Sequence, residues 1–141
     1  MKYEVVMSLR PKWAAAIQAG TKTLEVRTSG PDRREMKQSG PITVWIYETK
    51  TDGGRGMVVG KFLCREVCRE RIPPRDAQRA EEVERRTQLI MPDLERYRGG
   101  RKRLCLWEVE RPEAVEPFPI QRLGIHCPPV SWCRAGRTKA K

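Results

Sequence analysis

Residues 20–27 read Gly-Thr-Lys-Thr-Leu-Glu-Val-Arg and carry three charged side chains within six residues, directly after a glycine. Their alternation predicts a strand over residues 23–28. Side chains two apart on a strand share one face at a spacing of about 7 Å, and here that face holds Thr23, Glu25 and Arg27. Lys22 lies at the preceding turn and is free to point to the same face.

Two interpretations of this stretch follow from its pattern. Leu24 and Val26 point away from the charged face and are expected to enter the core. The charged face then either lines a polar cleft or lies in solvent with a Glu–Arg salt bridge, which contributes little to stability. The pattern by itself leaves both interpretations open, because structural ion pairs resemble functional ones.

A strand and a helix are expected before this stretch. Residues 2–8 alternate as a strand does. Pro11 suits the first turn of a helix and Gly20 its C-terminal stop. Trp13, Ala14 and Ile17 fall on one face of that helix.

The rest of the chain predicts more strands and two further helices. Helices are expected from Asp76 to about Ile90 and over residues 93–98. We expect a loop over residues 29–41 and an irregular crossing over the proline-rich residues 112–129. Strands are expected over residues 42–48, 56–68 (with a bulge at Gly60), 103–110 and 130–134.

These elements indicate an α+β fold. A mostly antiparallel, partly closed β-barrel with flanking helices is the expected architecture, because closure protects short strands from exposed edges. Trp45 and Trp107 lie in strand runs and are expected in the core. We expect one domain over residues 1–134 and a basic disordered tail over residues 135–141.

The composition indicates a polyanionic partner. Among 141 residues, 29 Lys+Arg face 18 Asp+Glu, a net charge of +11. The excess lies mainly in residues 1–40 and 61–103, and RNA or DNA is the obvious partner. The sequence contains no apolar run long enough to span a bilayer and no signal-peptide region at its start. Five cysteines, an odd number, favour reduced thiols and a cytoplasmic location.

Metal and cofactor sites are not expected. On a single strand, Cys64 and Cys68 would be about 13 Å apart, too far to bind one zinc ion. His126 is the only histidine, and no nucleophile-elbow motif supports a catalytic triad. The glycines in residues 53–56 lack the Lys-Ser/Thr of a phosphate-binding loop.

The chain resembles the ASCH domain family of the PUA-like superfamily. Gly20, Lys22, Glu25 and Arg27 match its Gly-x-Lys-x-x-Glu-x-Arg signature position by position. Residues 8–17, Ser-Leu-Arg-Pro-x-x-Ala-x-x-Ile, resemble the family's entry into its first helix. Residues 123–133, which include Pro-Pro-Val-Ser-Trp-Cys, resemble the closing segment of bacterial and phage-like members.

The resemblance implies a small barrel with a cleft beside the first helix, and RNA (single-stranded, or a modified nucleoside) as its ligand. Arginine pairs with phosphates or base edges, and aromatic rings stack on unpaired bases. The candidate ligand-binding residues are Arg10, Trp13, Lys22, Thr23, Glu25, Arg27, Tyr47, Ser131 and Trp132.

Three functions remain open at this point. Some PUA-like relatives hydrolyse N4-acetylcytidine with a lysine, a threonine three residues later and a glutamate on a later helix. Lys22 matches, but Glu25 stands at the threonine position, and the sequence does not choose among Glu81, Glu82 and Glu84.

A modified scheme is that Glu25 acts as general base and Lys22 stabilises an oxyanion, for this reaction or for RNA cleavage. Two neighbouring cations oppose protonation of Glu25, which favours binding over catalysis. A protein-interaction module with a merely structural ion pair is the third hypothesis.

Overall fold

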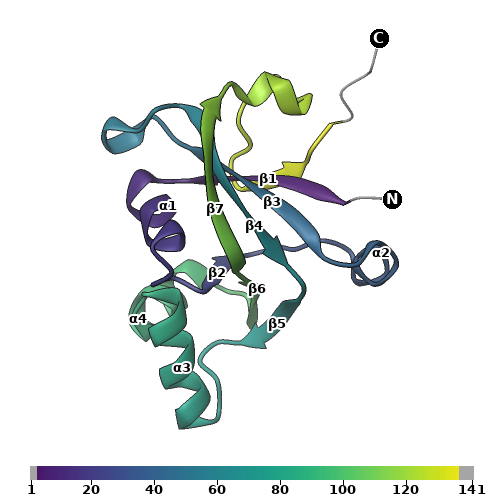
Figure 1. Ribbon diagram of the computed structural model, residues 1–141. Helices are drawn as coiled ribbons and strands as arrows, with labels where there is room; N and C mark the ends of the chain where they lie inside the picture. Colours follow the sequence, from purple (N-terminus) through teal and green to yellow (C-terminus); the bar gives the residue numbers. More distant parts are fainter. Residues whose placement is uncertain (1–2, 137–141) are drawn as a thin grey trace.

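A computed structural model describes residues 3–136, which form two open β-sheets with four helices. The larger sheet has the order β7-β4-β3-β1-β8, and the smaller one has the order β2-β6-β5. Only β1 and β3 pair in parallel, so the predicted mostly antiparallel α+β architecture is confirmed. Figure 1 shows α1, α3 and α4 on one side of the strands and α2 on the opposite side.

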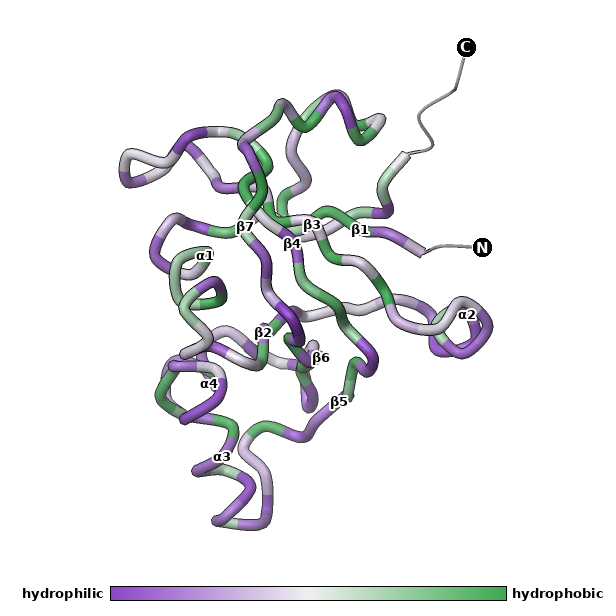
Figure 2. Tube along the Cα trace, in the orientation of Figure 1, coloured by the Kyte–Doolittle hydropathy of each residue, from purple (hydrophilic) through white to green (hydrophobic). Residues whose placement is uncertain are grey.

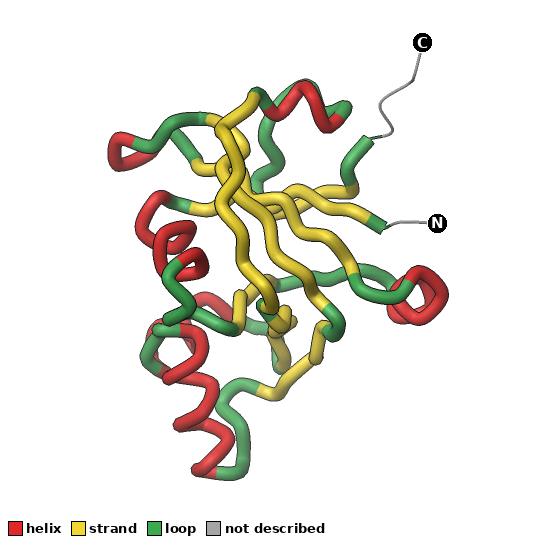
Figure 3. Tube along the Cα trace, viewed as in Figure 1, coloured by secondary structure: helices red, strands yellow, loops and turns green. Residues whose placement is uncertain are grey.

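The elements have the following bounds. The strands of the larger sheet are β1 (Glu4–Leu9), β3 (Ile42–Glu48), β4 (Met57–Cys64), β7 (Glu110–Phe118) and β8 (Trp132–Arg134). Those of the smaller sheet are β2 (Leu24–Arg27), β5 (Val67–Arg71) and β6 (Arg103–Glu108). The helices are α1 (Pro11–Gln18), α2 (Arg33–Ser39), α3 (Ala77–Thr87) and α4 (Met91–Arg98), with short 3-10 turns at Thr51–Gly53 and Ile120–Leu123 (Figure 3).

The predicted barrel is not confirmed. Residues 56–68 do not form one strand, because the chain leaves the larger sheet after Cys64 and begins the smaller sheet at Val67. As a result, β7 and β8 remain edges of one sheet, and β2 and β5 remain edges of the other. The expected bulge at Gly60 is present as a shift of register between β4 and both of its neighbours.

Two segments expected to be irregular are regular. Asp32 caps α2 by accepting hydrogen bonds from the backbone N–H groups of Arg34 and Glu35, which stabilises a helix inside the expected loop. Strand β7 occupies the first part of the proline-rich crossing. It accommodates Pro112 and Pro117 because it is an edge strand that pairs only with β4.

The core has three clusters of buried side chains. The first lies between the two sheets and α1 and includes Trp107, which is fully buried, as predicted. The second joins β2 and β6 to α3 and α4 and contains Leu24 and Val26, as expected from their face of the strand. The third lies on the other face of the larger sheet, where Trp45 packs only partly buried. Most of α3 is hydrophilic (Figure 2).

Candidate functional site

A cleft of about 650 Å³ lies where β2 faces the start of α1, the helix α4 and the closing segment. Four parts of the chain contribute to it, and they are far apart in sequence. Its lining residues are Ser8, Leu9, Arg10, Trp13, Lys22, Glu25, Val26, Arg27, Thr28, Leu89, Asp93, Tyr97, Val130 and Ser131. One face of β2 therefore packs against the core, and the other face lines this cleft.

Glu25 lies between two cations at the base of the cleft. Its Oε2 is 2.8 Å from Arg27 Nη2 and accepts a hydrogen bond of 2.9 Å from Arg27 Nε. Its Oε1 lies 3.7 Å from Lys22 Nζ. All three residues are less than 10% exposed, with values of 2% for Lys22, 5% for Glu25 and 8% for Arg27. The interpretation as a solvent-exposed strand with a surface salt bridge is therefore wrong.

The guanidinium of Arg27 is held by the protein itself. Nη2 donates to the backbone oxygen of Ser8 at 2.9 Å, and Nη1 donates to the backbone oxygen of Ser131 at 3.1 Å and to its Oγ at 3.2 Å. Arg27 thus joins β1, β2 and the closing segment. Because its Nε and Nη2 both contact Glu25 Oε2, Arg27 also fixes the orientation of that carboxylate.

The ammonium of Lys22 is enclosed on several sides. Nζ donates a hydrogen bond of 2.5 Å to the backbone oxygen of Thr87, the last residue of α3, and lies 4.6 Å from the centre of the Trp13 ring. Burial lowers the pKa of Lys22, and Arg27 acts in the same direction, whereas Glu25 opposes the shift. Lys22 therefore loses its proton more readily than an exposed lysine.

One oxygen of Glu25 lacks a hydrogen-bond donor. Glu25 Oε1 is buried and accepts no hydrogen bond from any residue that the structure describes. Its ion-pair partner Lys22 lies beyond hydrogen-bond distance and donates instead to Thr87. A buried acceptor without a donor costs about 1–3 kcal/mol, and a charged one costs more. Among the described residues that line the cleft, Glu25 thus has a buried hydrogen-bond acceptor that the protein leaves unsatisfied.

Two aromatic side chains line the cleft. Trp13 is covered by Lys22 and by Lys12, whose Nζ lies 4.8 Å from the ring centre. Tyr97, on α4, is 45% exposed and offers an open ring. The sequence analysis missed Tyr97, because a single aromatic residue in a short, highly charged helix carries no periodic signal.

Three predicted residues do not line the cleft. Thr23 Oγ1 accepts a hydrogen bond of 2.9 Å from Arg86 Nε on α3. Tyr47 is buried in the third core cluster. Trp132 packs edge-on against Trp107 with ring centres 5.3 Å apart, and its Nε1 donates to Ser29 Oγ at 3.0 Å. Of the predicted set, the cleft brings together Arg10, Trp13, Lys22, Glu25, Arg27 and Ser131.

The glutamates of α3 are also placed elsewhere. Glu82 pairs with Arg79 and Arg86, Glu84 accepts a hydrogen bond from the backbone of Met91, and Glu81 is exposed. None of the three lines the cleft. The contribution of α3 to the site is the backbone oxygen of Thr87, which a sequence pattern does not reveal.

Within residues 3–136, no group of three or more His, Cys, Asp or Glu side chains is arranged to hold a metal ion. Cys64 and Cys68 lie on β4 and β5, not on the single strand that the sequence analysis assumed. No helix in these residues is long and apolar enough to cross a membrane.

Comparison with known proteins places this architecture in a family. The family model described as "ASCH domain" matches residues 7–119, which include the Gly-x-Lys-x-x-Glu-x-Arg stretch. A search of curated proteins finds no match.

Solved structures of ASCH from Zymomonas mobilis superpose with a TM-score of 0.74 at 21% identity over 96% of this chain and 89% of the other. A serine-to-alanine variant of that protein matches with a TM-score of 0.73 at 21% identity, over 96% of this chain and 89% of the other. A tyrosine-to-phenylalanine variant matches with a TM-score of 0.74 at 21% identity, over 96% of this chain and 91% of the other. At this identity the likeness establishes the fold. Because the family model covers most of its length, the chain belongs to the ASCH domain family.

Proposed function

We propose that this protein binds RNA by taking one unpaired nucleobase, plain or modified, into the cleft beside β2. The observation that carries this proposal is the buried Glu25 Oε1 without a donor. Nucleobases present N–H groups on their edges, and such a group would donate to this oxygen the hydrogen bond that no described residue of the protein donates.

The walls of the cleft suit the rest of a nucleoside. Tyr97 has an exposed ring on which a base can stack, a contact worth about 1–3 kcal/mol per base. Leu89 and Val130 add apolar surface, and Arg10 adds a positive charge at the rim. The net charge of +11 attracts a polyanion toward the site.

The test compares two substitutions on or next to α4. We expect Tyr97→Ala to weaken binding of a mixed-sequence, single-stranded RNA by about 1–3 kcal/mol, measured by fluorescence anisotropy, because the stacking surface is removed. The matched control is Ile90→Ala, since Ile90 is 57% exposed and does not line the cleft. Equal affinities of wild type and Tyr97→Ala would overturn the proposal, as would an RNA affinity independent of salt concentration.

Hydrolysis is a second candidate function, favoured by the lowered pKa of Lys22. A neutral Lys22 amine would take a proton from a water as that water attacks the acetyl carbon of N4-acetylcytidine, or the phosphorus of an RNA phosphodiester, and Glu25 would stabilise the ammonium that forms. When the C–N or P–O bond breaks, the ammonium would return the proton to the departing amine or alkoxide, which leaves Lys22 neutral again. Release of acetate from N4-acetylcytidine, or cleavage of RNA, should then disappear in Lys22→Met. If the wild type turns over neither N4-acetylcytidine nor RNA, this function is excluded.

A further inference from the structure

A second depression, of about 280 Å³, lies at the C-terminal end of α4. It is formed where the loop from α4 to β6 meets the end of β5, so it is separate from the cleft. Its lining residues are Arg71, Ile72, Pro73, Arg98, Gly99, Gly100, Arg101 and Lys102. We refer to it as the basic pocket.

The charges of the basic pocket are all of one sign. Four of its lining residues are cationic and none is acidic. Within residues 3–136, the side chains of Arg71, Arg101 and Lys102 form no ion pair or hydrogen bond. Arg98 is held by the backbone oxygens of Ile72, at 2.5 Å, and Gly99, at 3.1 Å. Three cations are thus free to bind an anion.

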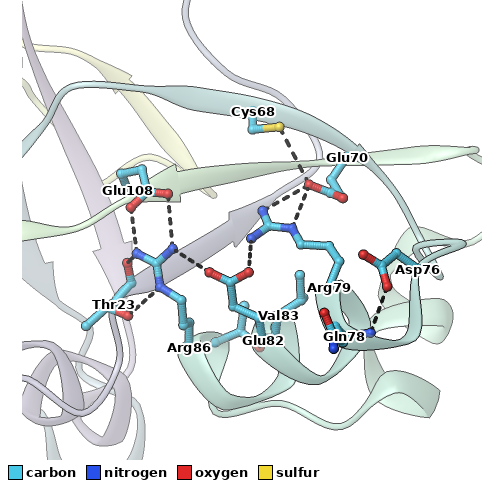
Figure 4. Close-up of polar contacts among 11 residues, drawn as sticks. Thr23, Cys68, Glu70, Asp76, Gln78, Arg79, Glu82, Val83, Arg86 and Glu108 are labelled. Atoms are coloured by element: carbon cyan, nitrogen blue, oxygen red, sulfur yellow. Dashed lines mark hydrogen bonds and ion pairs between the residues drawn. The ribbon is translucent and has the colours of Figure 1, made fainter.

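The arginines of α3 show the opposite arrangement. Arg79 pairs with Glu70 and Glu82, and Arg86 pairs with Glu82 and Glu108 (Figure 4). These side chains hold the helix to the smaller sheet and are neutralised by doing so. The unpaired cations are therefore a property of the basic pocket and not of every arginine-rich segment of this chain.

The backbone of the basic pocket is open. A Cβ atom at Gly99 or at Gly100 would meet no other atom within 4 Å. In the described residues the Gly100 N–H donates no backbone hydrogen bond, whereas the N–H groups of Gly99 and Arg101 bond to Glu95 and Arg98. Backbone N–H groups next to arginine and lysine are the usual partners of nucleic-acid phosphates. The open glycines let a phosphate approach this backbone closely.

Helix α4 connects the basic pocket to the cleft. Tyr97 lines the cleft, and the next residue, Arg98, lines the basic pocket. The helix has eight residues and is about 12 Å long, so a strand lying along it needs few nucleotides to reach both sites.

We propose that the basic pocket binds backbone phosphates of the same single-stranded RNA whose unpaired base enters the cleft. This inference rests on the proposed function, and it adds a direction: the strand runs from the cleft across α4 toward Arg101 and Lys102. The basic pocket supplies affinity that is independent of sequence, and the cleft selects the base.

The test uses the double variant Arg101→Ala/Lys102→Ala. In the wild type both side chains are exposed, and within the described residues neither forms an ion pair or a hydrogen bond. We expect several-fold weaker binding of a single-stranded hexanucleotide and a salt slope lower by about 0.7 for each phosphate that the variant no longer binds. Binding of a mononucleotide should be unchanged, because it occupies only the cleft. The matched control, Arg34→Ala/Lys37→Ala, removes the same charge from exposed positions on α2, on the opposite side of the molecule.

The outcomes separate this inference from the proposed function. If Tyr97→Ala weakens hexanucleotide binding but the two double variants behave alike, the basic pocket is not a phosphate site and the cleft proposal stands. If neither ligand binds the wild type, the proposed function itself fails. If the Arg101→Ala/Lys102→Ala variant loses binding to anionic phospholipid vesicles but keeps its hexanucleotide affinity, the basic pocket serves a membrane surface and this inference is overturned.

Discussion

At the scale of single residues, the carboxylate of Glu25 determines the character of the cleft. It balances one cation, Arg27, through two contacts on Oε2, and leaves Oε1 facing the second cation, Lys22, at 3.7 Å. Arg27 in turn is held by two other segments, β1 through Ser8 and the closing segment through Ser131. The trio therefore presents one oriented carboxylate oxygen beside one buried amine.

We expect Glu25→Gln to lower the free energy of unfolding by about 3–5 kcal/mol, because it leaves two buried cations without their counter-charge. The matched control is Glu110→Gln. Its partner Arg65 is 52% exposed and Glu110 is 37% exposed, so the loss there should stay within about 1 kcal/mol. Urea denaturation at neutral pH measures both, and equal losses would contradict the burial argument.

A buried thiol gives a pH-dependent prediction. Burial raises the pKa of Cys64 from 9.0 to about 12. Below pH 9 the thiol is protonated in both the folded and the unfolded chain, so its ionisation takes nothing from the free energy of unfolding. Above pH 9 the unfolded chain ionises first, so the free energy of unfolding falls as pH rises toward 12.

We expect Cys64→Ala to show a smaller decrease in the free energy of unfolding between pH 9 and 11 than the wild type. The control is Cys127→Ala, an exposed cysteine whose loss should leave the pH dependence as it is in the wild type. Identical slopes for wild type and Cys64→Ala would refute the assignment.

At the scale of elements, α3 depends on polar contacts for its position. Only Val83 and Thr87 of this helix are buried. Arg86 donates to Thr23 Oγ1, to the Thr23 backbone oxygen at 3.2 Å and to both carboxylate oxygens of Glu108 (Figure 4). Because Thr87 follows directly and accepts from Lys22, these contacts fix one wall of the charged trio.

We expect Arg86→Met to lower the free energy of unfolding by about 1–3 kcal/mol, since it leaves partly buried oxygens without donors. The adjacent Arg85→Met should change stability by no more than about 0.5 kcal/mol, because Arg85 is exposed. Thermal and urea unfolding of both variants measure these changes. An unchanged free energy of unfolding in Arg86→Met would show that apolar packing alone holds α3.

At the scale of the whole molecule, the two sheets share one core. Trp107 of the smaller sheet belongs to the same core cluster as Val5, Met7 and Phe62 of the larger sheet. A shared core couples the unfolding of both sheets. We therefore expect the two sheets to unfold as one unit, although they do not close into a barrel.

Thermal unfolding followed by circular dichroism and by tryptophan fluorescence should give coincident transitions. Trp107→Ala should shift both to lower temperature together, with a loss of about 3–5 kcal/mol. If only one of the two signals shifted, the sheets would unfold independently.

Local patterns were sufficient for much of the fold. Pro11 and the helix N-cap Asp76 lie where expected, and Gly20, with a φ of +83°, follows the end of α1. The prediction of a loop over residues 29–41 was wrong, because the N-cap at Asp32 stabilises α2 in spite of the two flanking Gly-Pro steps. The prediction of a barrel was wrong because a short turn after Cys64 takes the chain from the larger sheet to the smaller one. The alternation of apolar and polar residues continues through this turn, so the sequence pattern does not reveal it.

The sequence by itself determined that Glu25 and Arg27 share a face of β2 and that Lys22 lies just before this strand. Only the tertiary structure decided what covers that face. The partners of the trio are Ser131, 104 positions from Arg27, and Thr87, 65 positions from Lys22. Periodicity is a local property of the backbone, whereas burial and unmet hydrogen-bonding capacity depend on which distant segments pack against it.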